Sequence, residues 1–217
     1  MKKRTLALLL ALILCVGCAI GGTVAWLMYT TEPITTTFTT SDINITLEET
    51  NAQDNNSNSY KMVPGATITK DPVVTVKEGS EACWVFVKLE KMPASIPVNG
   101  DRKSFDDFFT YSIDSTNGWT SLYDVDGVAV YYMKITDATT DIVIPVISNN
   151  TIYVADSVTK EMMDAAKNNP PALAVTAYAI QSEHLSYPTG ADDTAKANYA
   201  WSLVSQNPPT ISGGGND

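Results

Sequence analysis

The residue with the broadest potential chemistry in this sequence is its single histidine, His184, which stands beside Glu183. A zinc hydrolase usually supplies two histidines one helical turn apart around a glutamate. A Ser-His-Asp enzyme needs a nucleophilic serine, commonly within a Gly-x-Ser-x-Gly sequence, which this chain lacks. His184 follows a predicted strand, so we interpret it as an exposed loop residue. We therefore expect no catalytic site and no enzyme activity.

Two groups of aspartates could bind calcium, which prefers several hard oxygen ligands. Asp101, Asp106 and Asp107 form one group, and Asp124 and Asp126 form the other. Neither group has the Asp-x-Asp-x-Asp-Gly loop with a distant glutamate. The alternatives are a calcium site and solvated acidic loops, and the sequence favours the loops. A Gly-rich phosphate loop and a dinucleotide fingerprint are also missing from the sequence, so we predict no cofactor.

Aromatic residues and one cysteine complete the set of side chains that could recognise a ligand or react. Trp119, Tyr131 and Tyr132 could form a sugar-binding face, but in alternating strands such residues are usually core or cross-strand packing. Cys83 alternates with two valines and a leucine, which favours a small buried core residue over a reactive thiol.

The N-terminus has the three parts of a secretory signal, which we assign to residues 1–25. Basic residues occupy positions 2–4, an apolar stretch spans residues 6–20, and small residues dominate positions 21–25. Small side chains before the cut fit the shallow pockets of a signal peptidase. The predicted cleavage site comprises Thr23, Val24, Ala25 and Trp26.

Three alternatives to this cleavage remain open. The uncharged run of residues 5–31 is long enough to cross about 30 Å of hydrocarbon, so the leader could stay as an uncleaved anchor. Cys18 could mark a lipid attachment site, although Cys15 stands where a leucine is usual. The cut could also fall earlier, after Gly21. In the preferred reading the membrane is contacted only by the leader, before cleavage.

Cleavage before Trp26 makes an acidic chain more acidic. The formal net charge of the full sequence is −10, and the mature chain keeps 11 Lys and Arg against 24 Asp and Glu, a net charge of −13. Such a surface repels phosphate, so we predict no nucleic-acid partner. Cys83 becomes the single thiol, which excludes an intrachain disulfide framework.

The mature chain is predicted to consist mainly of strands. Apolar and polar residues alternate with a period of two in several stretches, and residues 82–90 and 172–181 are apolar on both faces, as in core strands. A polar loop is expected at residues 49–59 and a hairpin turn at residues 124–127. Pro72 should interrupt its strand because it lacks an amide donor. Strands are predicted at residues 42–48, 67–76, 82–90, 108–113, 128–135, 141–146 and 172–181.

Two helices are predicted among these strands, at residues 157–168 and 193–205. In the first, Val158, Met162, Ala165 and Ala166 share a face. The second begins after Asp192 and Asp193, which suit its positive end, and its inward residues are Ala197, Trp201 and Val204. We predict a mainly β protein, with a single jelly-roll β-sandwich at residues 41–207, two short added helices and a flexible tail at residues 208–217.

The leader junction carries a family resemblance. The sequence Gly-Gly-Thr-Val-Ala-Trp-Leu at residues 21–27 is followed by Thr-Glu at 31–32 and Thr-Phe-Thr-Thr-Ser-Asp-Ile-Asn-Ile at 37–45. Further similarity lies in the Pro-Gly turn and strand of residues 63–72, the strand at 82–89, the strand at 177–181 and Ala200-Trp201. These features resemble exported proteins of Gram-positive bacteria that are processed by the SipW type of signal peptidase, the family that contains the biofilm fibre protein TasA and camelysin.

The resemblance implies a SipW-type signal peptidase as a partner, a secreted or cell-surface location, and self-association into matrix fibres. In TasA-like fibres the freed N-terminal segment adds as a strand to the neighbouring subunit, and the equivalent here is residues 26–40. A threonine-rich, uncharged part of this segment has high β-propensity. The candidate assembly strand comprises Thr35, Thr36, Thr37, Phe38, Thr39 and Thr40.

Other functions stay open beside fibre assembly. Residues 26–40 could instead be the first strand of their own subunit, and the protein could be a monomeric module that binds glycan or envelope components. Camelysin relatives have been described as metalloproteases, which the resemblance would imply here only if metal ligands were present, and His184 is the single histidine.

Overall fold

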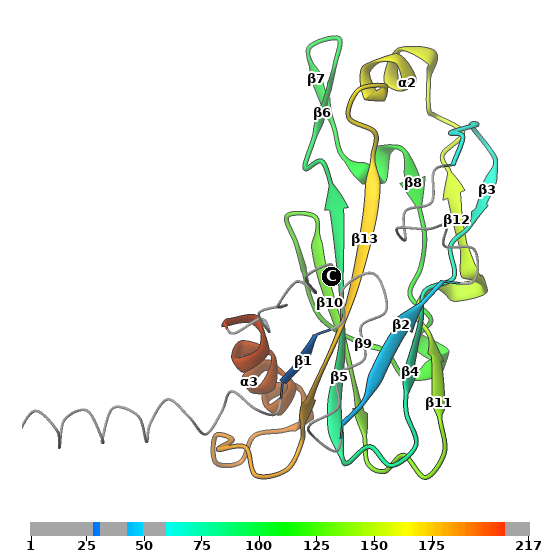
Figure 1. Cartoon of the computed structure of the whole chain (residues 1–217). Helices are drawn as coiled ribbons and strands as arrows, with labels where there is room; N and C mark the ends of the chain where they lie inside the picture. Colours follow the sequence, from blue (N-terminus) through cyan, green and yellow to red (C-terminus); the bar gives the residue numbers. More distant parts are fainter. Residues whose placement is uncertain (1–27, 31–42, 50–59, 207–217) are drawn as a thin grey trace, which may run out of the picture.

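The computed structural model describes residues 28–30, 43–49 and 60–206 of the 217-residue chain. The fold is mainly β and consists of several antiparallel sheets, as the sequence predicts (Figure 1). No helix in these described ranges is long and apolar enough to cross a membrane.

Sheet A is the largest sheet and runs the length of the molecule in Figure 1. Its strands lie in the order β1 (Met28–Thr30), β13 (Ala172–Gln181), β5 (Cys83–Met92), β10 (Val128–Ile135) and β9 (Thr120–Val125). All neighbouring strands are antiparallel. β5 and β13 pair along ten residues, whereas β1 pairs with β13 along only three.

The other strands form a second layer that is divided at Pro72. One piece, sheet B, consists of β11 (Ile142–Pro145), β4 (Val73–Val76) and β2 (Ile45–Glu48), and the other, sheet C, of β3 (Thr67–Thr69), β12 (Thr151–Val154) and β8 (Phe109–Thr110). The predicted strand at residues 67–76 is thus split around Asp71 and Pro72. Pro72 cannot donate, but its carbonyl accepts a 3.0 Å hydrogen bond from the Val146 amide. A small hairpin of β6 (Ile96–Val98) and β7 (Asp101–Lys103) extends beyond the layers.

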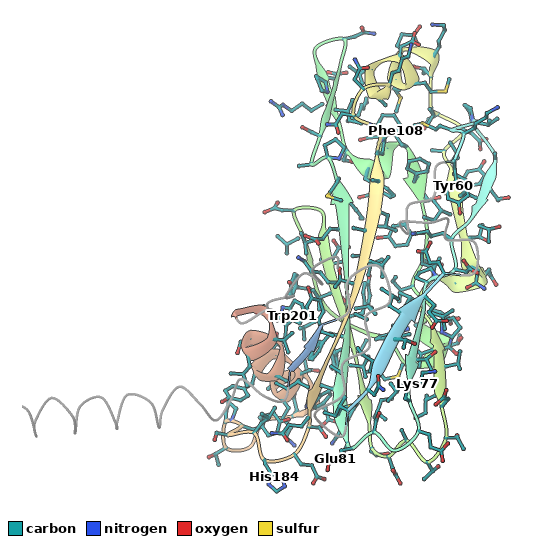
Figure 2. The ribbon with its side chains drawn as sticks, viewed as in Figure 1. Tyr60, Lys77, Glu81, Phe108, His184 and Trp201 are labelled. Atoms are coloured by element: carbon teal, nitrogen blue, oxygen red, sulfur yellow. The ribbon has the colours of Figure 1, made fainter. Side chains whose placement is uncertain are left out.

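Successive side chains of β5 point to opposite faces of sheet A, and apolar residues on both faces explain why both are covered. Cys83, Val85, Val87 and Leu89 face sheet B and share a core with Ile45, Leu47, Val74, Val76 and Ile144. Trp84 and Phe86 face the opposite way, toward the C-terminal helix. A third core includes Ile152 and Phe108, and Figure 2 shows Phe108 at the upper end of the molecule. The prediction that β5 is a core strand with two distinct faces is confirmed.

The C-terminal helix, α3 (Asp193–Gln206), packs on the outer face of sheet A. Ala197, Trp201 and Val204 are buried, as predicted. The Asp192 carboxylate accepts a 2.7 Å hydrogen bond from the Ala195 amide, which caps the helix N-terminus. Trp201 contacts the ring of Phe86 in a tilted arrangement and the ring of Tyr178 edge to face, each at 5.3 Å between ring centroids.

The other predicted helix is shorter than expected. α2 (Lys160–Ala166) begins only after Thr159, whose hydroxyl accepts a hydrogen bond from the Met162 amide and whose backbone is extended. Val158, Met162 and Ala166 are buried, but the inward position predicted for Ala165 is wrong, because this residue is exposed. The strand predicted at residues 108–113 is also too long, since only the two residues of β8 pair with a neighbouring strand and Ile113 makes one isolated bridge.

Candidate functional site

His184 lies in the loop after β13 and is exposed, which confirms the loop interpretation. Figure 2 shows it at the lower end of the molecule, far from the Phe108 core. The backbone of His184 is left-handed, with a φ of 60°. Among the described residues, no three His, Cys, Asp or Glu side chains come close enough to hold a metal ion. The described residues around His184 therefore provide no set of metal ligands.

The acidic residues singled out above are used in local structure. The Asp107 carboxylate accepts a 2.7 Å hydrogen bond from the Ser104 amide, and Asp106 pairs with Lys91 at 2.9 Å. Asp126 and Gly127 form the predicted two-residue hairpin turn between β9 and β10, with φ angles of 52° and 79°. Asp106 and Asp126 line one surface hollow together with Lys91, so a cation there meets a lysine ammonium.

The cysteine and the aromatic residues belong to the core, as the sequence favours. Cys83 is fully buried, and burial raises the pKa of its thiol to about 12, so the reactive thiolate is not populated near neutral pH. Trp119 is buried, and its indole N–H donates a 2.9 Å hydrogen bond to the Pro145 carbonyl. Tyr132 is buried against α3, while Tyr131 packs half-buried against the core between sheets A and B. These rings do not form an exposed sugar-binding face.

The signal-cleavage residues Thr23, Val24, Ala25 and Trp26 lie outside the described residues, and so does the candidate assembly strand, Thr35 to Thr40. Part of the 26–40 segment is described. Met28, Tyr29 and Thr30 form β1 and lie opposite Ile180, Ala179 and Tyr178 of the same chain. Within one copy, this segment therefore begins as the edge strand of sheet A.

One edge of β13 is covered by a described strand along only part of its length. β1 covers residues 178–180, and no other described strand pairs with β13 on that side. The strand contains no charged residue and no proline over its ten positions. Residues 172–176 thus present the backbone of an uncharged strand to an additional strand, which is the geometry used in β-strand addition.

An apolar cleft lies beside this half of β13, and we call it the β13 cleft. Its volume is about 380 Å³, within the range of ligand pockets. One wall is the start of β13, at residues 170–175, and the others come from the end of β2, from sheet C and from the end of β5. The apolar lining comprises Leu47, Met62, Ile68, Met92, Phe105, Phe109, Ile152, Pro170, Pro171, Leu173 and Val175, and the polar rim Glu48, Glu49, Tyr60 and Lys70.

The rim of the β13 cleft carries one lysine and two glutamates, so its formal charge is negative. The Lys70 ammonium forms a salt bridge with the Glu49 carboxylate, and both side chains are largely buried. Sequence reasoning did not find this cleft, because its lining residues are scattered from position 47 to position 175. The signal that could have pointed to the site was the absence of charge along residues 172–181.

Comparison with known proteins gives no further guidance: no protein-family model, no curated protein and no solved structure matches this chain.

Proposed function

We propose that this chain is an exported, non-catalytic structural protein of the TasA-like type, which assembles into extracellular or cell-surface fibres by strand addition. The observation that supports the proposal is the edge of β13, which is uncharged along ten residues and paired with β1 along only three. An added strand gains backbone hydrogen bonds there without needing an enzyme.

The described pairing of β1 suggests how copies would join. β1 contacts β13 of its own chain, and the same contact formed with the next copy would be a strand exchange. Such a contact is head-to-tail, because the donor segment and the acceptor edge are different parts of each subunit, so it propagates as a filament unless a ring closes. The two packed layers would act as a jelly-roll sandwich that holds the acceptor edge rigid.

Export would control this exchange. A SipW-type peptidase that cuts between Ala25 and Trp26 would free residues 26–40, whereas an uncut leader would keep them at the membrane. The substitution Ala25→Arg should therefore block both cleavage and filament formation, and filaments from uncleaved, detergent-free protein would contradict this step.

Electron microscopy of three purified chains tests the proposal. The chain that starts at Trp26 should form filaments, and so should a control that also lacks the C-terminal residues 208–217. The chain that starts at Thr39 should stay monomeric, and circular dichroism should confirm that it is folded. Filaments from the shortened chain would overturn strand addition. A Trp26 chain that stays monomeric but binds cell-wall polymer would favour the glycan- or envelope-binding module instead.

A further inference from the structure

We infer that the β13 cleft is a binding site for a small amphiphile, a molecule with one apolar chain or ring and a single cationic head group. The inference goes beyond the proposed function and does not depend on it. Strand addition would use the backbone edge of β13. The cleft instead uses side chains such as Leu173 and Val175, which β13 directs toward the second layer.

The volume of the cleft sets the size of the amphiphile. The cleft measures about 380 Å³. If each non-hydrogen atom occupies roughly 30 Å³, the share of one molecule in liquid water, this space holds about a dozen such atoms. An alkyl chain of about ten carbons with its head group has this size. The cleft is therefore large enough to surround the whole apolar part of such a molecule.

The inner wall of the cleft is apolar. It consists of residues that are at most 8% exposed, which are Leu47, Phe105, Phe109, Ile152 and Val175. An alkyl chain that lies against these side chains leaves water, and the gain grows with the apolar area that is buried. Sugars and nucleotides carry hydrogen-bonding groups along their length, and at this wall those groups would lose water without gaining a partner. The inner wall therefore favours the chain of an amphiphile.

The rim of the cleft carries an uncompensated negative charge. Lys70 is already engaged by Glu49, and the two side chains are only 17% and 14% exposed. Glu48 lies at the same rim and is exposed. Among the described residues, no ion pair includes Glu48. One carboxylate at the mouth of an apolar cleft is thus available to a ligand.

This arrangement of charges selects a cationic head group over an anionic one. The Glu48 carboxylate attracts a cation at the rim and repels an anion. An anion would gain Lys70 only by displacing Glu49, and the displaced carboxylate would stay largely buried without its partner. A cation leaves the pair of Lys70 and Glu49 intact. The chemistry of the rim therefore complements that of the inner wall, and together they fit a cationic amphiphile.

Isothermal titration calorimetry with two matched probes tests the sign of the head group. Decylammonium and decanoate have chains of similar length and opposite charge. Each is titrated at neutral pH into the chain that starts at Trp26, below the concentration at which the probe forms micelles. We expect one decylammonium per chain, bound about tenfold more tightly than decanoate. Decanoate that binds as tightly, or decylammonium that does not saturate, would overturn the inference.

The substitution Glu48→Gln tests where the head group lies. It removes the charge with little change in shape, so the preference for decylammonium over decanoate should fall from about tenfold to about twofold or less. The matched control, Glu183→Gln, removes the same charge from the exposed loop after β13 and should keep the preference. An unchanged preference in Glu48→Gln would overturn the assignment of the cationic head group to this rim.

The substitution Met62→Trp tests where the apolar chain lies. Met62 is half-buried and lines the cleft, so a larger side chain there should occupy part of the space and weaken decylammonium binding about tenfold or more. The matched control, Val63→Trp, places the same ring at the next position, which is 52% exposed and outside the lining, and should bind normally.

Circular dichroism should show that both tryptophan variants are folded. If Met62→Trp does not fold, Ile68→Phe changes a second half-buried position of the lining and should weaken binding in the same direction. Decylammonium binding that is unchanged in the folded lining variant would overturn the inference, because the chain would then lie outside the β13 cleft.

Discussion

β9 lies at one edge of sheet A and has no described partner beyond it. This six-residue strand contains Asp124, and its pairing with β10 has an irregular register at Val130 and Tyr131. Toward the other edge, where β1 pairs along only three residues, lies β13, a ten-residue strand with no charge and a regular register with β5. Short length, inward or edge charges and bulges are the devices by which proteins prevent edge-to-edge pairing. β9 has two of these devices, a charge and an irregular register, and β13 has none of them.

The difference between β9 and β13 means that sheet A is protected against pairing with additional strands only on its β9 side. An edge that is long, flat and uncharged is retained when pairing with another strand is useful to the protein, and is otherwise an aggregation hazard. β1 covers residues 178–180 of this edge, and the β13 cleft is lined by residues 170–175. Under the proposed function, strand addition would therefore take place on the β13 side of sheet A and not on the β9 side.

The largest effect is expected from one charge placed on each edge in turn. Ala174→Lys puts a lysine on the uncovered half of β13, directly opposite Glu90, so the subunit itself should remain folded. We expect this variant to lose filaments, as judged by electron microscopy and sedimentation. The matched control, Ser121→Lys on exposed β9, should assemble like the unmodified chain.

The reverse result would contradict the assignment of the acceptor edge to β13. If Ser121→Lys abolished filaments and Ala174→Lys did not, the acceptor would be the β9 edge. Equal loss in both variants, with unchanged thermal unfolding, would mean that the two edges pair with each other.

A smaller effect, on stability, is expected from the helix that supports both edges. Trp201 contacts Tyr178 of β13 and Tyr123 of β9, at 5.3 and 6.5 Å between ring centroids. Trp201→Ala should lower the free energy of unfolding by about 3–5 kcal/mol, because it leaves a cavity under α3. Denaturant unfolding measures this change. Asn198→Ala, at an exposed position of the same helix, should change it by about 0.5 kcal/mol or less. A similar loss in both variants would contradict the role of Trp201.

The smallest effect is expected at Asp141, in sheet B and away from both edges. The Glu78 amide and the Lys77 ammonium, each at 2.9 Å, lower the pKa of Asp141 below its ordinary value. A lowered folded-state pKa stabilises the fold above the unfolded-state pKa, and this stability is lost as the pH falls through the folded value. Asp141→Asn should therefore lose less thermal stability between pH 5 and pH 3 than the unmodified chain. An identical loss in both would contradict the assignment.

Strong local patterns in the sequence predict the central part of this fold well. β10 and β13 match their predicted bounds. The two faces of β5 were also predicted, because residues that alternate along this strand belong to two different buried faces. β6 and β12 were missed, since they are short and β6 contains Pro97. The order of strands within a sheet depends on contacts between distant residues, which a local pattern does not record. The same reason hides the β13 cleft and the edge beside it, although the absence of charge along residues 172–181 can be read from the sequence.

The ten residue pairs between β5 and β13 also have a mechanical consequence. A pull along β13 loads all ten pairs together in shear, while a pull along β1 is resisted by three. In an assembly joined through β13, a stretching force would meet its weakest point in the added strand before it reached the subunit. The tensile strength of such a fibre would then be set by how far its donor segment extends toward Ala172.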